Sequence, residues 1–316
     1  MPVARRRDLQ GTGGVCEAGG WCEQGSKTPT RCYPGTYNPN EGADEATDCL
    51  TCPAGEYCIG TLDPTTSGLC NAGYWCDTGS SVPNQHICSA GTFCVAGSDS
   101  ESDCLAGTYN PFKGQDDCLD CEAGYFCDVD GMSDLNECPT GHYCPALSQS
   151  GTANPCPAGT YRDIVKGTAS TDCFDCPPGK YCLQGSSTPT GDCDPGYYCK
   201  TNAEVAQPPD SAPDFGPCPA GHYCPAGTGD PFECPPGTFL ASTGNTIIND
   251  CDPCTAGFYC DEPGADAADK PCPAGYYCPQ GTDTKYPATE CAEGQECPEG
   301  SSTTTECLPG FYQNAP

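Results

Sequence analysis

One short motif recurs along the chain and restricts what it can fold into: cysteine, two variable residues, glycine, one variable residue and an aromatic residue. Seventeen copies occur, and all of them keep the glycine, while Glu296 replaces the aromatic residue in one copy. A copy follows about every 18 residues, which is typical of a repeat array rather than of one globular domain. The copies begin at Cys16, Cys32, Cys52, Cys70, Cys88, Cys104, Cys121, Cys138, Cys156, Cys176, Cys193, Cys218, Cys234, Cys254, Cys272, Cys291 and Cys307.

The motif has two forms, and their order divides the chain into larger units. In twelve copies a second cysteine follows the aromatic position, whereas four copies have a longer loop that runs to a Cys-x2-Cys step. Each long loop is followed by two or three short ones. We therefore divide the chain into an N-terminal segment with the end of a preceding unit (1–31), four repeat units (32–103, the shorter 104–155, 156–233 and 234–306) and the start of a truncated unit (307–316).

The composition leaves little material for a conventional core. Hydrophobic residues are 36% of the chain even when its 33 cysteines are counted, and glycine (40) and proline (34) make up almost a quarter. Burial on this scale does not offset the conformational entropy of the chain. Disulfides must supply the difference, each contributing typically about 2–4 kcal/mol. Thiols at this density persist as disulfides in an oxidising compartment, so the sequence predicts an extracellular or cell-surface protein of the secretory pathway.

The charge and hydropathy of the chain limit which kinds of binding partner we expect. The net charge of −31, from 43 acidic and 12 basic residues, excludes the basic face that nucleic-acid binding needs. No apolar stretch is long enough to span a membrane. The first ten residues contain Arg5, Arg6 and Arg7 without an apolar region, so we do not expect them to be a signal peptide. We expect that the signal has been removed or that this is a piece of a longer chain.

The residues of the motif predict how each repeat is built. The glycine suits a turn with positive φ, or a close approach of two backbones beside a bridge. The aromatic residue is expected to pack against a disulfide, as in Gly55 with Tyr57, Gly179 with Tyr181 and Gly275 with Tyr277. Stacking on sugars or bases is the alternative role. We expect small disulfide-rich repeats, mostly irregular with short β-hairpins, for example near 36–37 and 160–161, with little or no helix, stacked into an elongated rod.

The run from Cys32 to Cys76 resembles the six-cysteine repeat of tumour-necrosis-factor receptors and the related ephrin-receptor-like repeat. The resemblance extends from Cys16 to Cys307 and rests on the Cys-x-x-Gly-x-Tyr opening and the Cys-x2-Cys step. The receptor pattern implies the pairs Cys32–Cys49, Cys52–Cys70, Cys58–Cys76, Cys104–Cys118, Cys121–Cys138 and Cys127–Cys144, with Cys156–Cys173 and Cys234–Cys251 closing the other long loops.

Two disulfide schemes remain open from the sequence alone. Where a unit has an extra pair, we expect it to close on itself, as in Cys88 with Cys94, Cys218 with Cys224 and Cys291 with Cys297. A rival scheme closes every Cys-x5-Cys pair locally. Both schemes leave Cys307 without a partner.

Arrays of such repeats resemble those of large surface proteins of protists and algae, including components of flagellar hairs and cell coats. This implies a structural role as a segment of a filament, stalk or surface fibre. The expected partners are further copies of the chain, or matrix proteins, cell-coat proteins and glycans. The alternative is a receptor-like module for a protein or glycan ligand, for which Phe215, Ile247 and Ile248 are the candidate apolar contacts. The resemblance itself supplies no ligand.

The sequence offers little for catalysis or for cofactors, so we do not expect an enzyme. The Cys-x2-Cys steps lie too far apart along the chain to form a zinc site with one another. Asp128, Asp130 and Asp134 form an acidic turn that is a candidate for calcium, although the spacing departs from the EF-hand pattern. The three histidines, His86, His142 and His222, are not accompanied by a catalytic motif.

The sequence contains candidate sites for O-linked glycans but none for N-linked glycans. No asparagine begins an Asn-x-Ser/Thr acceptor, so N-linked glycans are not expected. The Ser- and Thr-rich segments 186–190 and 301–305 are candidates for O-linked sugars.

Overall fold

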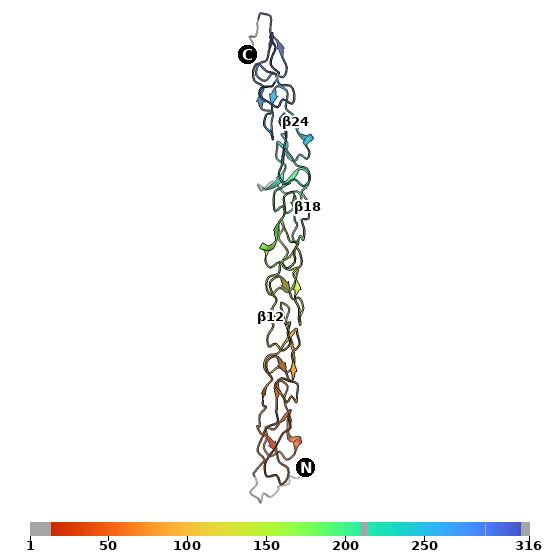
Figure 1. The fold of residues 1–316 in the computed structure, drawn as a ribbon, viewed down its shortest axis with the longest axis vertical. Coiled ribbons are helices and arrows are strands. Elements are labelled where there is room, and N and C mark those ends of the chain that lie inside the picture. Colours follow the sequence, from red (N-terminus) through yellow and green to blue (C-terminus); the bar gives the residue numbers. More distant parts are fainter. Residues whose placement is uncertain (1–13, 210–213, 288, 311–316) are drawn as a thin grey trace, which may run out of the picture. The chain divides into compact units, whose positions relative to one another are not determined.

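The structure is a computed structural model that describes residues 14–209, 214–287 and 289–310 of the chain. It forms two compact units, Met1–Glu137 with Cys144–Ala153, and Cys138–Tyr143 with Asn154–Pro316. Short strands and turns, without an α-helix among the described residues, make up both units (Figure 1). We call the stretch from one motif cysteine to the next a module and name it by its first cysteine.

The strands form fourteen antiparallel two-stranded hairpins among the described residues. In the first unit they are β1 (Gly20–Trp21) with β2 (Thr30–Arg31), β3 (Thr36–Tyr37) with β4 (Leu50–Thr51), β5 (Glu56–Tyr57) with β6 (Gly68–Leu69), β7 (Tyr74–Trp75) with β8 (His86–Ile87), β9 (Thr92–Phe93) with β10 (Ser102–Asp103), β11 (Thr108–Tyr109) with β12 (Leu119–Asp120), and β13 (Tyr125–Phe126) with β14 (Asn136–Glu137).

The second unit continues the same pattern. Its hairpins are β15 (Thr160–Tyr161) with β16 (Phe174–Asp175), β17 (Lys180–Tyr181) with β18 (Gly191–Asp192), β19 (Tyr197–Cys199) with β20 (Phe215–Pro217), β21 (His222–Tyr223) with β22 (Phe232–Glu233), β23 (Thr238–Phe239) with β24 (Asp252–Pro253), β25 (Phe258–Tyr259) with β26 (Lys270–Pro271), and β27 (Gln295–Glu296) with β28 (Thr305–Glu306). Three long loops contain a 3-10 turn: η1 (Ala46–Asp48), η2 (Ser170–Asp172) and η3 (Ile248–Asp250).

Each hairpin has the same register, set by the motif. The aromatic position pairs with the residue two before the next module, as Tyr57 pairs with Gly68. The turn before it is closed by the Glu56 N–H, which donates to the carbonyl of Pro53 at 3.3 Å. The strands predicted near 36–37 and 160–161 are confirmed as β3 and β15.

Thirty-two of the 33 cysteines are disulfide-bonded, and Cys307 is free. The four long loops close as the receptor resemblance implies, by Cys32–Cys49, Cys104–Cys118, Cys156–Cys173 and Cys234–Cys251. The pairs Cys88–Cys94, Cys218–Cys224 and Cys291–Cys297 also close on themselves, as expected.

The rest of the receptor pairing is wrong, and the rival local scheme holds. Cys52 bonds to Cys58 rather than to Cys70. Cys70 bonds to Cys76. In the second repeat unit Cys121 bonds to Cys127, which excludes Cys121–Cys138 and Cys127–Cys144.

The turn inside the motif explains the local pairing. It reverses the chain within six residues and brings the Cα atoms of Cys52 and Cys58 to 5.9 Å, which is within disulfide reach. The turn by itself therefore supplies the geometry of the local bridge, whereas a bridge across modules would also need the next module to be in place.

The cysteines are also the interior of the protein. Of the described alanine, valine, isoleucine, leucine, methionine and aromatic residues, five are buried, whereas most cysteine side chains are fully enclosed. The five are Ala43, Tyr109, Ala203, Leu240 and Tyr259. This supports the expectation that sulfur–sulfur bonds take the place of a hydrophobic core.

The aromatic residues pack against disulfides, as predicted, but the bridge belongs to the following module. Tyr109 of the Cys104 module lies against Cys121 and Cys127. Tyr181, one of the representative motif residues, packs in the same way on Cys193 and Cys199. In these clusters the ring therefore connects two successive modules.

Where a long loop lacks the second cysteine of the motif, another buried side chain fills its place. Asn38 and Asn110 are fully buried there, and Leu240 is 3% exposed. The Asn38 amide donates to the carbonyl of Gly20 at 2.8 Å, so its polar group is satisfied inside the protein. The fourth residue of this set, Arg162, is also buried and donates through its guanidinium to backbone carbonyls.

Backbone hydrogen bonds join most of the described modules to the next in a fixed pattern. Between the Cys52 and Cys70 modules, the Gly55 N–H donates to the Cys76 carbonyl at 2.9 Å, and the Cys58 N–H donates to the Ser80 carbonyl at 3.0 Å. Two further bonds run back, from Gly79 N–H to Cys52 O at 2.8 Å and from Cys70 N–H to Gly55 O at 2.9 Å. The corresponding four bonds recur between the Cys176 and Cys193 modules.

The motif glycine is required for a contact two modules away. Gly221 has a φ of +78°, and a Cβ atom placed on it would lie 2.1 Å from the carbonyl oxygen of Gly264. Gly264 belongs to the Cys254 module, the next but one after that of Gly221. A side chain is therefore excluded both by the left-handed backbone and by the neighbouring carbonyl.

A second left-handed turn in each module was not predicted. It usually follows the aromatic position by four or five residues and is usually glycine, as in Trp75-Cys-Asp-Thr-Gly79. Three other residues adopt positive φ at this turn: Leu147, Lys166 and Asn202, with φ of 64°, 64° and 56°. The recurrence of a glycine four or five residues after the aromatic position is the sequence signal that identifies this turn.

Two glycine variants separate the effect of backbone strain from that of module packing. Gly221→Ala and Gly244→Ala both place alanine at a φ near +78°, which costs roughly 1–2 kcal/mol. A Cβ atom at Gly244 meets nothing within 4 Å, whereas one at Gly221 must displace the Gly264 carbonyl. We expect Gly221→Ala alone to accelerate amide hydrogen exchange in residues 254–265. Equal exchange of this segment in both variants would contradict the packing role of Gly221.

Candidate functional site

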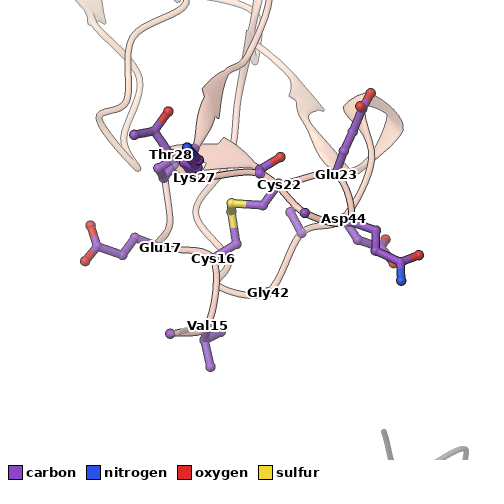
Figure 2. Close-up of a pocket in the computed structure, with 15 residues that line it drawn as sticks. Val15, Cys16, Glu17, Cys22, Glu23, Lys27, Thr28, Gly42 and Asp44 are labelled. Carbon is purple, nitrogen blue, oxygen red and sulfur yellow. A yellow bond between two sulfur atoms is a disulfide. The ribbon is translucent and has the colours of Figure 1, made fainter. Parts of the chain in front are cut away.

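A hollow lies at the Cys16–Cys22 loop. It has a volume of about 740 Å³ and is lined by residues 14–17, 22–29 and 42–44. Figure 2 shows the carboxylates of Glu17 and Glu23 on opposite sides of the disulfide, pointing away from one another. Charged groups that diverge in this way do not form an acid–base pair, so we assign no catalytic role to the hollow.

The candidate calcium ligands are used by the fold. Asp130 accepts a hydrogen bond from the Ala106 N–H at 2.8 Å, and Asp128 accepts one from the Asn136 side chain at 3.2 Å. Asp134 accepts one from the hydroxyl of its neighbour Ser133 at 3.3 Å. Among the described residues no group of three or more His, Cys, Asp or Glu side chains is placed to hold a metal ion. The structure therefore does not bring the three aspartates together as a ligand set.

The histidines occupy three separate modules. His142 and His222 are half-buried, and the Nδ1 atom of each lies about 3 Å from a backbone carbonyl, at 3.1 and 2.9 Å. His86 stacks on Trp75 with ring centroids 4.2 Å apart, and its Nε2 atom lies 3.6 Å from a carboxylate oxygen of Asp77. The rings thus serve local packing within hairpins.

Aspartates in the long loops have a structural task that the sequence did not indicate. Asp172 accepts hydrogen bonds from the N–H groups of Thr168 and Ala169, at 2.7 and 3.3 Å, around η2. Asp250 does the same for Thr246 and Ile247 around η3. These backbone hydrogen bonds, which stabilise the ionised form, lower the pKa values of Asp172 and Asp250 below the usual 3.8. Asp48 accepts the equivalent bonds in η1.

Exposed apolar side chains are spread over both units. In the first unit, Leu50, Leu69, Ile87 and Leu119 project from the second strands of hairpins and are about half exposed. In the second unit, Ile247 and Ile248 are 50% and 52% exposed beside η3. Phe215, the other residue proposed for ligand contact, is half-buried in β20.

An aromatic pair in the Cys272 module is partly exposed, with Tyr286 on the surface. The rings of Tyr276 and Tyr286 meet edge to face with centroids 5.8 Å apart. The Tyr276 hydroxyl donates to Glu290 at 3.2 Å, and this hydrogen bond raises the pKa of Tyr276 above its usual value. The pair offers an aromatic surface with a carboxylate beside it.

No protein-family model matches the chain, and no curated protein matches it by sequence. The likeness to receptor repeats is therefore one of motif. What the structure supports is coarser: tandem small modules, closed by disulfides and built on β-hairpins. In the described residues no helix is long and apolar enough to cross a lipid bilayer.

The described modules repeat one arrangement of turn, disulfide and hairpin. Equivalent residues recur in successive modules, and the charged groups described above bind backbone or neighbouring side chains rather than converge on one cavity. The disulfide content indicates an oxidising environment.

Acid should loosen the long loops through their aspartates. Because the folded pKa values of Asp172 and Asp250 are lowered, their stabilising effect is present above the unfolded value of about 3.8 and is lost as the pH falls through the folded value. We expect hydrogen exchange in residues 168–173 to rise below about pH 4, after correction for the intrinsic pH dependence of exchange.

Two variants check the assignment. Asp172→Ala should show the fast exchange already at pH 7, with no further change on acidification. Asp163→Ala, at an exposed carboxylate in the same loop, should behave as the unaltered protein does. Equal behaviour of the two variants would disprove the role of Asp172.

Proposed function

We propose that this chain is an extracellular structural protein, a segment of a filament, stalk or cell-surface fibre in the manner of a flagellar hair. The observation that carries the proposal is the interior made of disulfides, repeated in module after module with the same backbone bonds. Such a chain is stabilised locally at every step. The stability of the folded chain therefore does not depend on a single core that damage at one position could unfold.

The acidic surface fits this role. A net charge of −31 keeps the chain hydrated and opposes its collapse into irregular aggregates. Ordered association must then come from specific contacts between copies, or with cell-coat proteins and glycans, at the apolar and aromatic side chains exposed along the modules. Catalysis has no part in the proposal, because the function it describes is mechanical.

A receptor-like module is the second candidate. The exposed pair Ile247 and Ile248 favours it, since two adjacent apolar side chains at half exposure on one turn can anchor a protein ligand. The motif resemblance to receptor repeats points in the same direction. In this case one region of one repeat unit would dominate binding, whereas a fibre would use many modules.

Self-association of the purified chain distinguishes the two candidates. We expect the oxidised protein to form regular fibres or oligomers by sedimentation and electron microscopy, and we expect native material to contain it within a fibre. Ile247→Ser with Ile248→Ser serves as the matched variant. A fibre built from many modules should tolerate this change, whereas a receptor would lose its ligand. A chain that stays monomeric and captures one discrete partner, lost in the double variant, would refute the structural role.

A further inference from the structure

The position of the disulfides determines how the chain responds to tension. The fifteen bridges that lie within one or the other unit each close a loop inside a single module, with sequence separations of 6, 14 or 17 residues. None of these fifteen joins one module to another. Wherever these fifteen bridges lie, the covalent connection between successive modules is the main chain.

The ties between modules are all of a weaker kind. They include up to four backbone hydrogen bonds per junction and the aromatic ring that packs on the next bridge. Side-chain hydrogen bonds, such as that from the Ala106 N–H to Asp130, and the approach of motif glycines to a carbonyl two modules ahead add to them. When two modules separate, each of these hydrogen bonds is replaced by a hydrogen bond to water. Each one therefore contributes little to the net free energy of unfolding. A pulling force along the chain loads these contacts directly, because none of the fifteen bridges spans them.

We propose that the protein is an extensible tether, in which modules separate one after another under tension while their disulfide loops stay closed. Between Cys52 and Cys70 the closed loop spans 5.9 Å from Cα to Cα, at Cys52–Cys58. The eleven residues that follow the loop, 59–69, can extend to about 40 Å. Each short module thus adds a limited extension to the chain. The disulfide-closed loop does not extend further while its bridge is intact.

Recoil follows from the same geometry. A separated module keeps its reversed loop, because the bridge still holds the two cysteines together. Refolding has to re-form the hydrogen bonds between modules but not the turn. The loop stays closed by its disulfide, so refolding does not lose the entropy of loop closure again. The inference goes beyond the proposed fibre: it concerns one chain, and it holds or fails whether or not copies associate.

The pairing expected from the receptor resemblance would give the opposite behaviour. Bridges Cys52–Cys70 and Cys58–Cys76 would lock two modules together and prevent their separation. The extension of the oxidised chain therefore depends on the local pairing seen in Cys52–Cys58 and Cys70–Cys76.

Pulling single full-length chains by their two ends tests the proposal. Without reductant, we expect a series of small extension steps that reverse when the force is released. Adding a reductant under load should then lengthen the chain by about 15 Å for each six-residue loop and about 55 Å for each 17-residue loop. A chain that does not extend until reductant is added would overturn the proposal.

One double variant provides the control. Replacing the Cys70–Cys76 pair by Cys70→Ser with Cys76→Ser should add about 15 Å to the oxidised length and create no new free thiols. Under cross-module pairing the same change would expose two thiols, on Cys52 and Cys58, and this outcome would also overturn the proposal. Sedimentation of the same samples reports self-association separately, so failure of the tether and failure of the fibre are distinguishable.

Discussion

The closure of a six-residue loop by its own two cysteines is the constraint from which the rest of the structure follows. The motif turn places the two Cα atoms 5.8–6.5 Å apart in the short loops. A bridge at that distance fixes the turn without help from a core. The buried sulfur then gives the aromatic residue of the preceding module a surface to pack on, and the interior of the protein is a succession of such contacts. Few other apolar side chains are buried, because the disulfides already stabilise each module.

Repetition depends on the backbone more than on the side chains. The same four hydrogen bonds join most successive modules, and the motif glycine approaches a carbonyl two modules ahead. These contacts use backbone N–H and C=O groups, which all residues except proline can supply, so many of the remaining positions can vary. The long loops show the same tolerance. Asn38, Arg162 and Leu240 fill one position with different chemistry, and each remains buried.

The sequence predicts the parts of the fold that one module determines by itself. The hairpins, the oxidised cysteines and the packing of rings such as Tyr181 on disulfides were all accessible from the motif. Relationships between modules were not. The receptor resemblance placed Cys52 with Cys70, because a shared opening motif does not specify which neighbouring cysteine lies within reach. The second turn escaped notice because Leu147, Lys166 and Asn202 interrupt its glycines. The task of Asp172 depends on N–H groups that become adjacent only once the long loop has folded. The proposed contacts of a fibre lie on exposed residues, where neither motif nor packing selects a partner.

Disulfides within each module replace a hydrophobic core in this protein. Counting the free thiols of the untreated protein tests this most directly. Denatured without reductant, the 316-residue chain should react with a thiol reagent at one residue, Cys307, and peptide mapping should recover Cys52 bonded to Cys58. Reaction at many cysteines, or recovery of Cys52 bonded to Cys70, would contradict the account.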